Sequence, residues 1–305
     1  MSSGRTATNV RLYQIAYSAQ TLADVELGYE VLDNTANSRP DWYEIWPMVQ
    51  FLQARALDEH DFYGFFSTKF GRKTQLSKAD VVAVVQRAAA RGADVALFSP
   101  QPDMGACFLN VFEQGETFDP GLIDAMQAFL LHIGRSVDLR SLVMDARQTV
   151  FSNYFVARPV FWRAWLDLVL PLIAVCDDFA NPLACRLTPA TTYPGRAQRK
   201  VFLAERLASL LLATDARWRT YAADPFTMGW SVTRLRDYRH EAVISDALKM
   251  AHRENGFPEY LLAFAAMRSR FSQHQRPIGQ EPPALSAADA PECGAGQCHR
   301  TEESL

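Results

Sequence analysis

The sequence contains few cysteines, and this shortage excludes two classes of protein. Its 5 cysteines follow no disulfide framework, and an odd number in a chain of 305 residues is typical of reduced thiols in the cytosol. The pair in CGAGQCH, residues 293–299, is followed by a single histidine, whereas a zinc site usually needs four ligands. We therefore expect exposed thiols there, and neither a disulfide scaffold nor a metal site.

Long apolar runs and clustered basic residues are also missing. The first ten residues lack the apolar stretch of a signal peptide, and runs such as LDLVLPLIAV, residues 166–175, are far shorter than the roughly 20 residues of a membrane helix. The net charge is −3 and the 31 Lys and Arg residues are scattered, which gives no basic stripe for nucleic acid. We expect a cytoplasmic protein without an integral membrane segment and without a nucleic acid partner, with at most peripheral association with the inner face of the membrane.

Several catalytic signatures are absent as well. The chain has no G-x-S-x-G elbow, no H-E-x-x-H and no G-x-G-x-x-G after a strand. GFFSTKFGRKT, residues 64–74, resembles a phosphate loop, but six residues separate its glycines where a P-loop has four. Lys69, Arg72 and Lys73 could neutralise a diphosphate in another geometry, and a solvated basic loop explains them equally well.

The apolar periodicity predicts an α/β fold with a mostly parallel sheet flanked by helices and a helical second half. Residues 1–9 and the Pro- and Ala-rich residues 276–305 have the composition of disordered segments, which leaves 10–275 as a single domain. The expected strands cover residues 10–17, 61–70, 93–100 and 149–158, and the expected helices cover residues 41–57, 78–92, 121–134, 160–176 and 199–214.

The stretch LDNTANSRPDWYEIWPMVQFL, residues 32–52, combines carboxylates with aromatic rings. Asp41 and Glu44 have the spacing of a capping box, which predicts a helix that begins near Asp41 or at Pro47. Sugars and nucleosides present both C–H faces and hydroxyls, and they therefore call for flat rings beside hydrogen-bond acceptors. Such groups are offered by Trp42, Tyr43, Trp46, Asp33, Asn34, Asp41 and Glu44; a capped helix with a buried aromatic staple is the alternative.

Polar residues also follow the predicted strand 93–100, where ligands bind in open α/β sheets. Asp103 could hold a divalent metal, Mg²⁺ or Mn²⁺, bound to a nucleotide diphosphate. Glu113 could act as a general base if burial raised its pKa, and Asn110 and Gln114 accompany it. Surface capping and pairing are the alternative for these residues.

Three later motifs carry polar groups. The strand 149–158 would deliver Asn153 to a hydroxyl-rich ligand, although an asparagine that satisfies loop backbone is more common. The adjacent carboxylates in VCDDFANP, residues 175–182, follow a helix, so we favour a helix C-terminal turn over a D-x-D metal motif. Glu205 and Arg206 interrupt an apolar helix, where charges are usually paired with each other or used in a site.

Several of these segments together resemble a bacterial family of glycosyltransferases from capsule and lipopolysaccharide gene clusters. The resemblance covers about residues 10–226 and implies a GT-A-like, Rossmann-type fold that transfers a sugar from a nucleotide sugar to a growing glycan. FFSTKF replaces the HYRRYF-like run of the family, so its phosphate-binding arginines are not carried over and Lys69 stands nearest. A strand-borne D-x-D is also absent, which leaves metal dependence open. The segments are YQIAYS, DNTANSRPDWYEIWPM, FYGFFSTKF, ALFSP with NVFEQGE, SNYFVARPVFW and KVFLAERLASLLL.

The leading hypothesis is therefore a glycosyltransferase of the hexosyltransferase type, inverting or retaining, in capsule or O-antigen biosynthesis. A non-catalytic glycan-binding or assembly protein of similar fold is the alternative, and a glycosidase with paired carboxylates is a third. The candidate catalytic residues are Asp41, Glu113 and Glu205, and the candidate substrate-binding residues are Tyr13, Asp33, Asn34, Trp42, Glu44, Lys69, Lys73, Asp103, Asn110, Gln114, Asn153 and Arg206.

Overall fold

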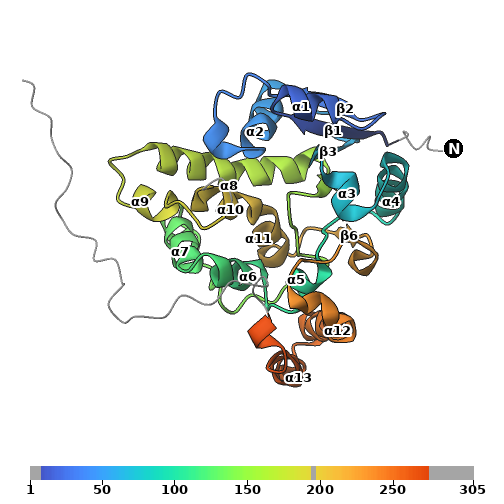
Figure 1. Ribbon diagram of the computed structural model, residues 1–305, viewed down its shortest axis with the longest axis vertical. Coiled ribbons are helices and arrows are strands. Elements are labelled where there is room, and N and C mark those ends of the chain that lie inside the picture. The colour runs from blue at the N-terminus through green and yellow to red at the C-terminus, as the bar shows by residue number, and fades with distance from the viewer. Residues whose placement is uncertain (1–7, 194–196, 275–305) are drawn as a thin grey trace, which may run out of the picture.

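The computed structural model describes residues 8–193 and 197–274, and its centre is a six-stranded sheet (Figure 1). Every strand except β5 runs in the same direction, because β5 pairs antiparallel with both of its neighbours. The predicted α/β fold with a mostly parallel sheet is confirmed. The strands, in spatial order, are β2 (Glu30–Asp33), β1 (Val10–Ala16), β3 (Phe62–Ser67), β5 (Phe155–Ala157), β4 (Val95–Leu97) and β6 (Thr220–Ala222).

The central strands are fully buried, which explains their aromatic and β-branched composition. All residues of β3, β4 and β5 are buried. Gly64 of β3 lies opposite Val156 of β5, and a Cβ atom at Gly64 would lie 2.7 Å from Val156 Cγ2. The glycine therefore permits the close approach of β5 to β3.

Helices cover both faces of the sheet. Apolar residues of α2, α7, α8, α10 and α11 form the larger core cluster on one face, and residues of α3 and α4 pack on the other. The α-helices are α1 (Ala19–Ala23), α2 (Ile45–Ala54), α3 (Phe70–Thr74), α4 (Lys78–Ala90), α5 (Pro102–Ala106), α6 (Val111–Phe118), α7 (Leu122–His132), α8 (Pro159–Asp177), α9 (Ala184–Leu187), α10 (Arg199–Glu205), α11 (Leu207–Thr214), α12 (Arg239–Asn255) and α13 (Pro258–Arg268). The 3-10 helices are η1 (Pro40–Trp42), η2 (Pro225–Thr227), η3 (Arg234–Asp237) and η4 (Ser272–His274).

The expected helices over 78–92, 121–134 and 160–176 are confirmed as α4, α7 and α8. The expected start of the helix over 41–57 is wrong, because α2 begins at Ile45 and Tyr43 has a left-handed φ of 49°. No capping box forms, since Glu44 makes no cap hydrogen bond with its side chain. The helix over 199–214 is also interrupted, because α10 ends at Glu205 and α11 begins at Leu207, with Arg206 between them.

The strand expected over 149–158 is shorter than predicted. Its β structure covers only Phe155–Ala157, and Ser152 and Asn153 lie in a preceding turn with φ values of 58° and 54°. Asn153 is therefore placed by a left-handed turn and not by a strand. The expected tail 276–305 lies outside the described residues, as do residues 1–7 of the expected N-terminal tail, whereas Asn9 donates hydrogen bonds to Asp61.

Helix α8 is the one described helix that is long and apolar enough to cross a membrane by length and composition. Its side chains Trp162, Trp165 and Leu168 are completely buried in the larger core cluster. A helix that is buried in this way is a core helix of the fold, which agrees with the expected lack of an integral membrane segment.

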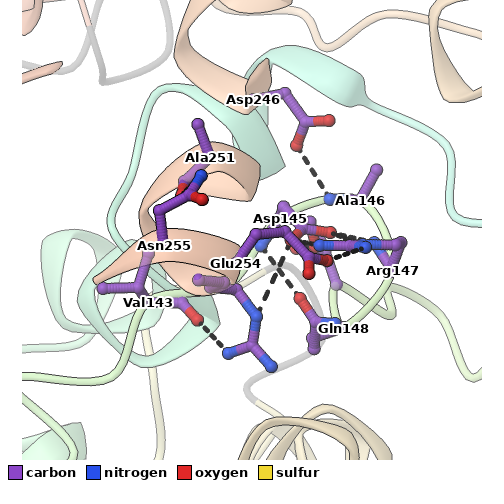
Figure 2. Close-up of polar contacts among 11 residues, drawn as sticks. Val143, Asp145, Ala146, Arg147, Gln148, Asp246, Ala251, Glu254 and Asn255 are labelled. Atoms are coloured by element: carbon purple, nitrogen blue, oxygen red, sulfur yellow. Dashed lines mark hydrogen bonds and ion pairs between the residues drawn. The ribbon is translucent and has the colours of Figure 1, made fainter. Parts of the chain in front are cut away.

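A network of charged groups attaches α12 to the loop that precedes β5 (Figure 2). The buried carboxylate of Asp145 accepts hydrogen bonds from the backbone and guanidinium of Arg147, which also pairs with Glu254 of α12 at 2.7 Å. Asp246 of α12 accepts a hydrogen bond of 2.8 Å from the backbone of Ala146. These contacts hold α12 and α13 at the end of the molecule opposite β2 in Figure 1.

Candidate functional site

The candidate site lies where the parallel strands end, which is where ligands bind in open α/β sheets. Strand β3 ends at Ser67 and leads directly into α3, while β5 begins just after Tyr154 because it runs the other way. The hydroxyls of Ser67 and Tyr154 are 2.6 Å apart and form a buried hydrogen bond. Tyr17 is the first residue after β1 and lies at the same edge.

Two carboxylates from distant parts of the sequence meet at this edge. Glu44 precedes α2 and follows Tyr43, whose left-handed φ is uncommon for a tyrosine. Glu205 is the last residue of α10. Both are partly exposed, yet protein atoms crowd them closely enough that burial and the charge of Glu205 raise the pKa of Glu44 to about 7. Burial likewise raises the pKa of Glu205.

Cationic side chains from the neighbourhood of α3 face the two carboxylates. The charges of Lys73 and Lys69 oppose the rise in the pKa of Glu44, and Arg206, followed by Lys73, opposes that of Glu205. Lys73 Nζ donates a hydrogen bond of 3.0 Å to Ser152 Oγ and lies 5.5 Å from the centre of the Tyr154 ring. Lys73 is thus fixed beside the carboxylates by the turn before β5.

The opposite charges nevertheless do not form direct pairs. Among the described residues, neither Glu44 nor Glu205 makes a side-chain hydrogen bond or an ion pair. The charge of Glu205 is close enough to raise the pKa of Glu44, but neither carboxylate contacts Lys73. The arrangement therefore places unpaired carboxylates beside cationic side chains, with Glu44 able to hold or release a proton near neutral pH.

Other groups at this edge complete the site. The pKa values of Tyr17 and Tyr154 are both raised. The main cause is burial in each case, and the second is the nearby charge of Glu44. Asn153 is 3% exposed and its side-chain oxygen has no hydrogen-bond partner among the described residues. Two consecutive left-handed residues, Ser152 and Asn153, together with Tyr43, concentrate backbone strain here, as is common in functional sites.

Of the predicted site residues, the structure brings together Glu44, Glu205, Lys69, Lys73 and the turn that contains Asn153. Sequence reasoning missed Tyr17, Ser67 and Tyr154. Tyr17 ends the expected strand 10–17, so a systematic reading of strand ends would have found it, whereas Ser67 lay inside the expected strand 61–70 because β3 ends earlier than predicted. Tyr154 was hidden because the direction of β5 was not predicted.

The structure does not favour the predicted role of Asp41 as a catalytic base. Its carboxylate accepts a hydrogen bond of 2.6 Å from Lys200 Nζ and two from Arg39. Burial alone would raise the pKa of Asp41, but these hydrogen bonds outweigh burial and lower it. Trp42 is also not a ligand platform, since it is completely buried beneath Lys200, whose Nζ lies 4.6 Å from the ring centre.

Asp103 and Asn110 are both occupied by hydrogen bonds within the protein. Asp103 is completely buried, and its two oxygens accept hydrogen bonds from the hydroxyl and backbone of Ser231. It therefore holds the segment 226–233 and has no oxygen free for a metal. Asn110 caps α6, because its side chain accepts from Phe112 and Glu113 and donates to Leu139 and Leu142.

Structural roles are also found for Arg206 and for two residues of α6, Glu113 and Gln114. Glu113 pairs with Arg268 of α13 at 2.7 Å and accepts from the backbone of Leu109, so it is not a free base. Gln114 accepts a hydrogen bond of 2.7 Å from Arg206. The Arg206 guanidinium also donates to the carbonyls of Val111 and Phe202. Glu205 and Arg206 therefore point to different surroundings, one to the site and one to the core.

Three N-terminal candidates lie outside the cluster. Tyr13 packs in the core against Phe51 and Phe65, with ring centres 4.7 and 5.5 Å away, so the structure does not favour its predicted role in substrate binding. Asp33 ends β2 and accepts hydrogen bonds from Thr35. Asn34 donates its backbone N–H to Ala16 at 2.7 Å, so both lie at the correct edge without a hydrogen bond to the cluster.

The adjacent carboxylates Asp177 and Asp178 behave as predicted. Asp177 ends α8 and pairs with Arg39, and Asp178 caps the turn that follows. In the described part of the chain, no group of three or more His, Cys, Asp or Glu residues is arranged to hold a metal ion.

An open hollow of about 860 Å³ adjoins α3 on its far side, lined by Gln75, residues 226–231 and the start of α12. Gly229 joins its wall to the site, because its N–H donates to the carbonyl of Lys73 at 3.1 Å and its own carbonyl accepts from Gln101 at 2.7 Å. A Cβ atom at Gly229 would lie 2.6 Å from the Lys73 carbonyl oxygen, so only glycine allows this contact.

Comparison with known proteins matched no family model, no curated protein and no solved structure. The function is therefore inferred from the residues of the site and their arrangement.

The raised pKa of Glu44 predicts how stability depends on pH. Between the ordinary value of 4.5 and about 7, the folded protein holds a proton that the unfolded chain has lost, so stability falls as pH rises through this window. Glu44→Gln removes this loss. We expect the variant to gain about 2 kcal/mol relative to the native protein between pH 5 and pH 8, measured by denaturant unfolding.

Glu59→Gln is the matched control for this measurement. Hydrogen bonding to Arg163 lowers the pKa of the exposed Glu59 from its ordinary value of 4.5. Folded and unfolded chains have therefore both lost this proton above about pH 5, and the replacement should leave a constant difference in stability between pH 5 and pH 8. A Glu44→Gln curve parallel to that of the native protein would contradict the raised pKa.

Because Glu205 and Arg206 have different surroundings, we expect their substitutions to affect stability differently. Arg206→Met leaves Val111 and Gln114 without their donor, and we expect it to lower the free energy of unfolding by about 3 kcal/mol. Glu205→Gln removes a charge that burial disfavours, and it should not lower stability at pH 8. Thermal unfolding of both variants tests this, and equal losses would show that the two residues act as one structural pair.

Proposed function

We propose that this protein is a glycosyltransferase that uses a nucleotide sugar, and that the cluster of Glu44, Glu205 and Lys73 is its active site. The supporting observation is the unpaired arrangement of two carboxylates opposite the cationic residues near α3, at the carboxyl ends of the parallel strands. A sugar nucleotide has a neutral, hydroxyl-rich part and an anionic diphosphate, and these two parts match the carboxylates and the cationic side chains.

In the proposed reaction, Lys69, Arg72 and Lys73 bind the diphosphate. The acceptor hydroxyl loses its proton to Glu44 as its oxygen forms a bond to the anomeric carbon. The bond from that carbon to the diphosphate oxygen breaks, and the nucleoside diphosphate leaves with the electron pair. The cationic side chains stabilise the charge that develops on the leaving group.

The pKa of Glu44, about 7, suits this role, because a general base works best when its pKa is near the working pH. Glu205 contributes by raising that pKa with its own charge and by offering acceptors to sugar hydroxyls. Asp41 and Glu113, whose carboxylates are already paired, take no part in the reaction.

The fold and the sequence favour the same assignment. A mostly parallel sheet flanked by helices is what a GT-A-like domain requires, and the resemblance to glycosyltransferases of capsule and lipopolysaccharide gene clusters gives the substrate class. We therefore propose a glycan acceptor in surface polysaccharide biosynthesis, a cytoplasmic location, and peripheral contact with the inner face of the membrane. Assays with and without Mg²⁺ or Mn²⁺ decide whether a divalent metal takes part.

The first test is nucleotide binding. Calorimetry with UDP, GDP, CDP and CMP is expected to identify one nucleotide that binds, and Lys73→Met should weaken its binding about 10-fold or more, equivalent to about 1.4 kcal/mol. Lys78→Met is the matched control, because Lys78 lies on α4 and donates to the carbonyl of Gly28. If no nucleotide binds at millimolar concentration, the transferase assignment is wrong.

The second test is sugar transfer with the nucleotide that binds. Glu44→Gln keeps the size of the side chain but cannot accept the proton, and we expect it to reduce the transfer rate about 100-fold or more with little change in nucleotide affinity. Glu59→Gln serves as the control variant. Glycan binding without nucleotide binding would instead support the non-catalytic assignment, and release of free sugar without a nucleotide would support a glycosidase.

A further inference from the structure

A buried lysine outside the cluster joins the two segments that carry its carboxylates. Lys200 is 4% exposed and belongs to the first turn of α10, the helix that ends at Glu205. Its Nζ donates a hydrogen bond of 2.6 Å to Asp41 of η1, three residues before Glu44. The same ammonium lies 4.6 Å from the centre of the Trp42 ring.

This contact is part of a longer chain of alternating charges. Asp41 also accepts from Arg39, whose guanidinium pairs with both oxygens of Asp177 at the end of α8. Asp177 is exposed and makes no ion pair or side-chain hydrogen bond with α10 among the described residues, so within this network the ion pair of Lys200 and Asp41 links α10 to η1.

Each residue of this ion pair lies a few residues away from one carboxylate of the site. Lys200 and Glu205 are separated by little more than one helical turn, about 7.5 Å along the axis of α10. Asp41 and Glu44 are separated by the single turn that contains the left-handed Tyr43. Lys200 is the buried member of this ion pair, and breaking the pair would leave its ammonium buried without a compensating charge, which is unfavourable.

We propose that Lys200 is a positioning residue, which through Asp41 and Trp42 fixes the separation of Glu44 and Glu205 across the site. The inference rests on the proposed function for its catalytic meaning, but its structural content can be measured without any activity. It explains why a lysine is buried beneath η1 although it contacts neither carboxylate.

The protonation of Glu44 provides a direct readout. Burial and Glu205 raise the pKa of Glu44, while Lys73 and Lys69 oppose them; Tyr17 and Tyr154 also face it. When the link is broken, the two segments separate, water reaches Glu44, and both raising causes weaken. Loss of the Lys200 charge alone would act in the opposite direction, because removing a cation raises the pKa of a carboxylate.

The experiment is a pH titration of the Glu44 side-chain carboxyl by carbon-13 NMR, assigned with Glu44→Gln. Lys200→Met, which keeps the chain length and removes the charge, should lower the midpoint by at least about one pH unit. Lys200→Arg, which keeps a donor to Asp41, should stay within about half a unit of the native protein. Asp177→Asn, which disturbs the same network away from α10, should leave the midpoint unchanged.

A midpoint that stays constant or rises in Lys200→Met would overturn the proposal. Should that variant fail to fold, Asp41→Asn breaks the link at a partly exposed position, and a midpoint no lower than that of Asp177→Asn would overturn it equally. Calorimetry with the nucleotide identified above separates this inference from the function. Nucleotide affinity should be retained in Lys200→Met because α3 is not part of the link, whereas a native protein that binds no nucleotide refutes only the proposed function.

Discussion

The direction of β5 determines where the candidate site can form. Because β5 runs against β3 and β4, the chain must enter it at the edge where those two strands leave the sheet. The turn of Ser152 and Asn153 therefore meets the start of α3, and Lys73 can bond to Ser152. A strand parallel to its neighbours would have brought this turn to the opposite edge. The close approach that Gly64 permits is part of the same constraint, since β5 must fit between two buried strands.

The site has an electrostatic cost that the remainder of the fold offsets. Burying carboxylates without partners is unfavourable, and proteins normally neutralise or pair such groups. Here Asp41, Asp103 and Glu113 follow that rule, each with a cation or hydroxyl partner. Glu44 and Glu205 do not, and the large aromatic core on both faces of the sheet supplies the stability that tolerates them. Exceptions of this kind are typical of functional positions.

Much of the architecture was predictable from local patterns. Helices such as α4 and α8 have regular apolar periodicity, and α4 has a clear N-cap at Ser77. The strand β5 was mispredicted because β propensity over 149–158 does not reveal direction or the left-handed turn at Ser152. The break at Arg206 was not predicted, because the hydrogen bonds that stabilise it come from Val111 and Gln114, far away in sequence.

The site was predicted in part, for a similar reason. Glu44, Glu205, Lys69 and Lys73 were selected for their charge, but so were Asp41, Asp103 and Glu113, and only tertiary contacts separate the two groups. A sequence shows which residues can ionise, whereas the partners that neutralise them, such as Lys200 for Asp41, come from elements far apart in the chain. Tyr17, Ser67 and Tyr154 carry no charge, so a selection by charge missed them, and only their positions in the fold place them at the site.

The contact of Gly229 with Lys73 has a mechanical consequence. The backbone of Gly229 bonds to Lys73 on one side and to Gln101 on the other, and two residues later Ser231 is fixed to the buried Asp103. Helix α3, the wall of the open hollow and the start of α5 are therefore joined by a short series of hydrogen bonds. A displacement of α3 must either break these bonds or carry the wall of the hollow with it.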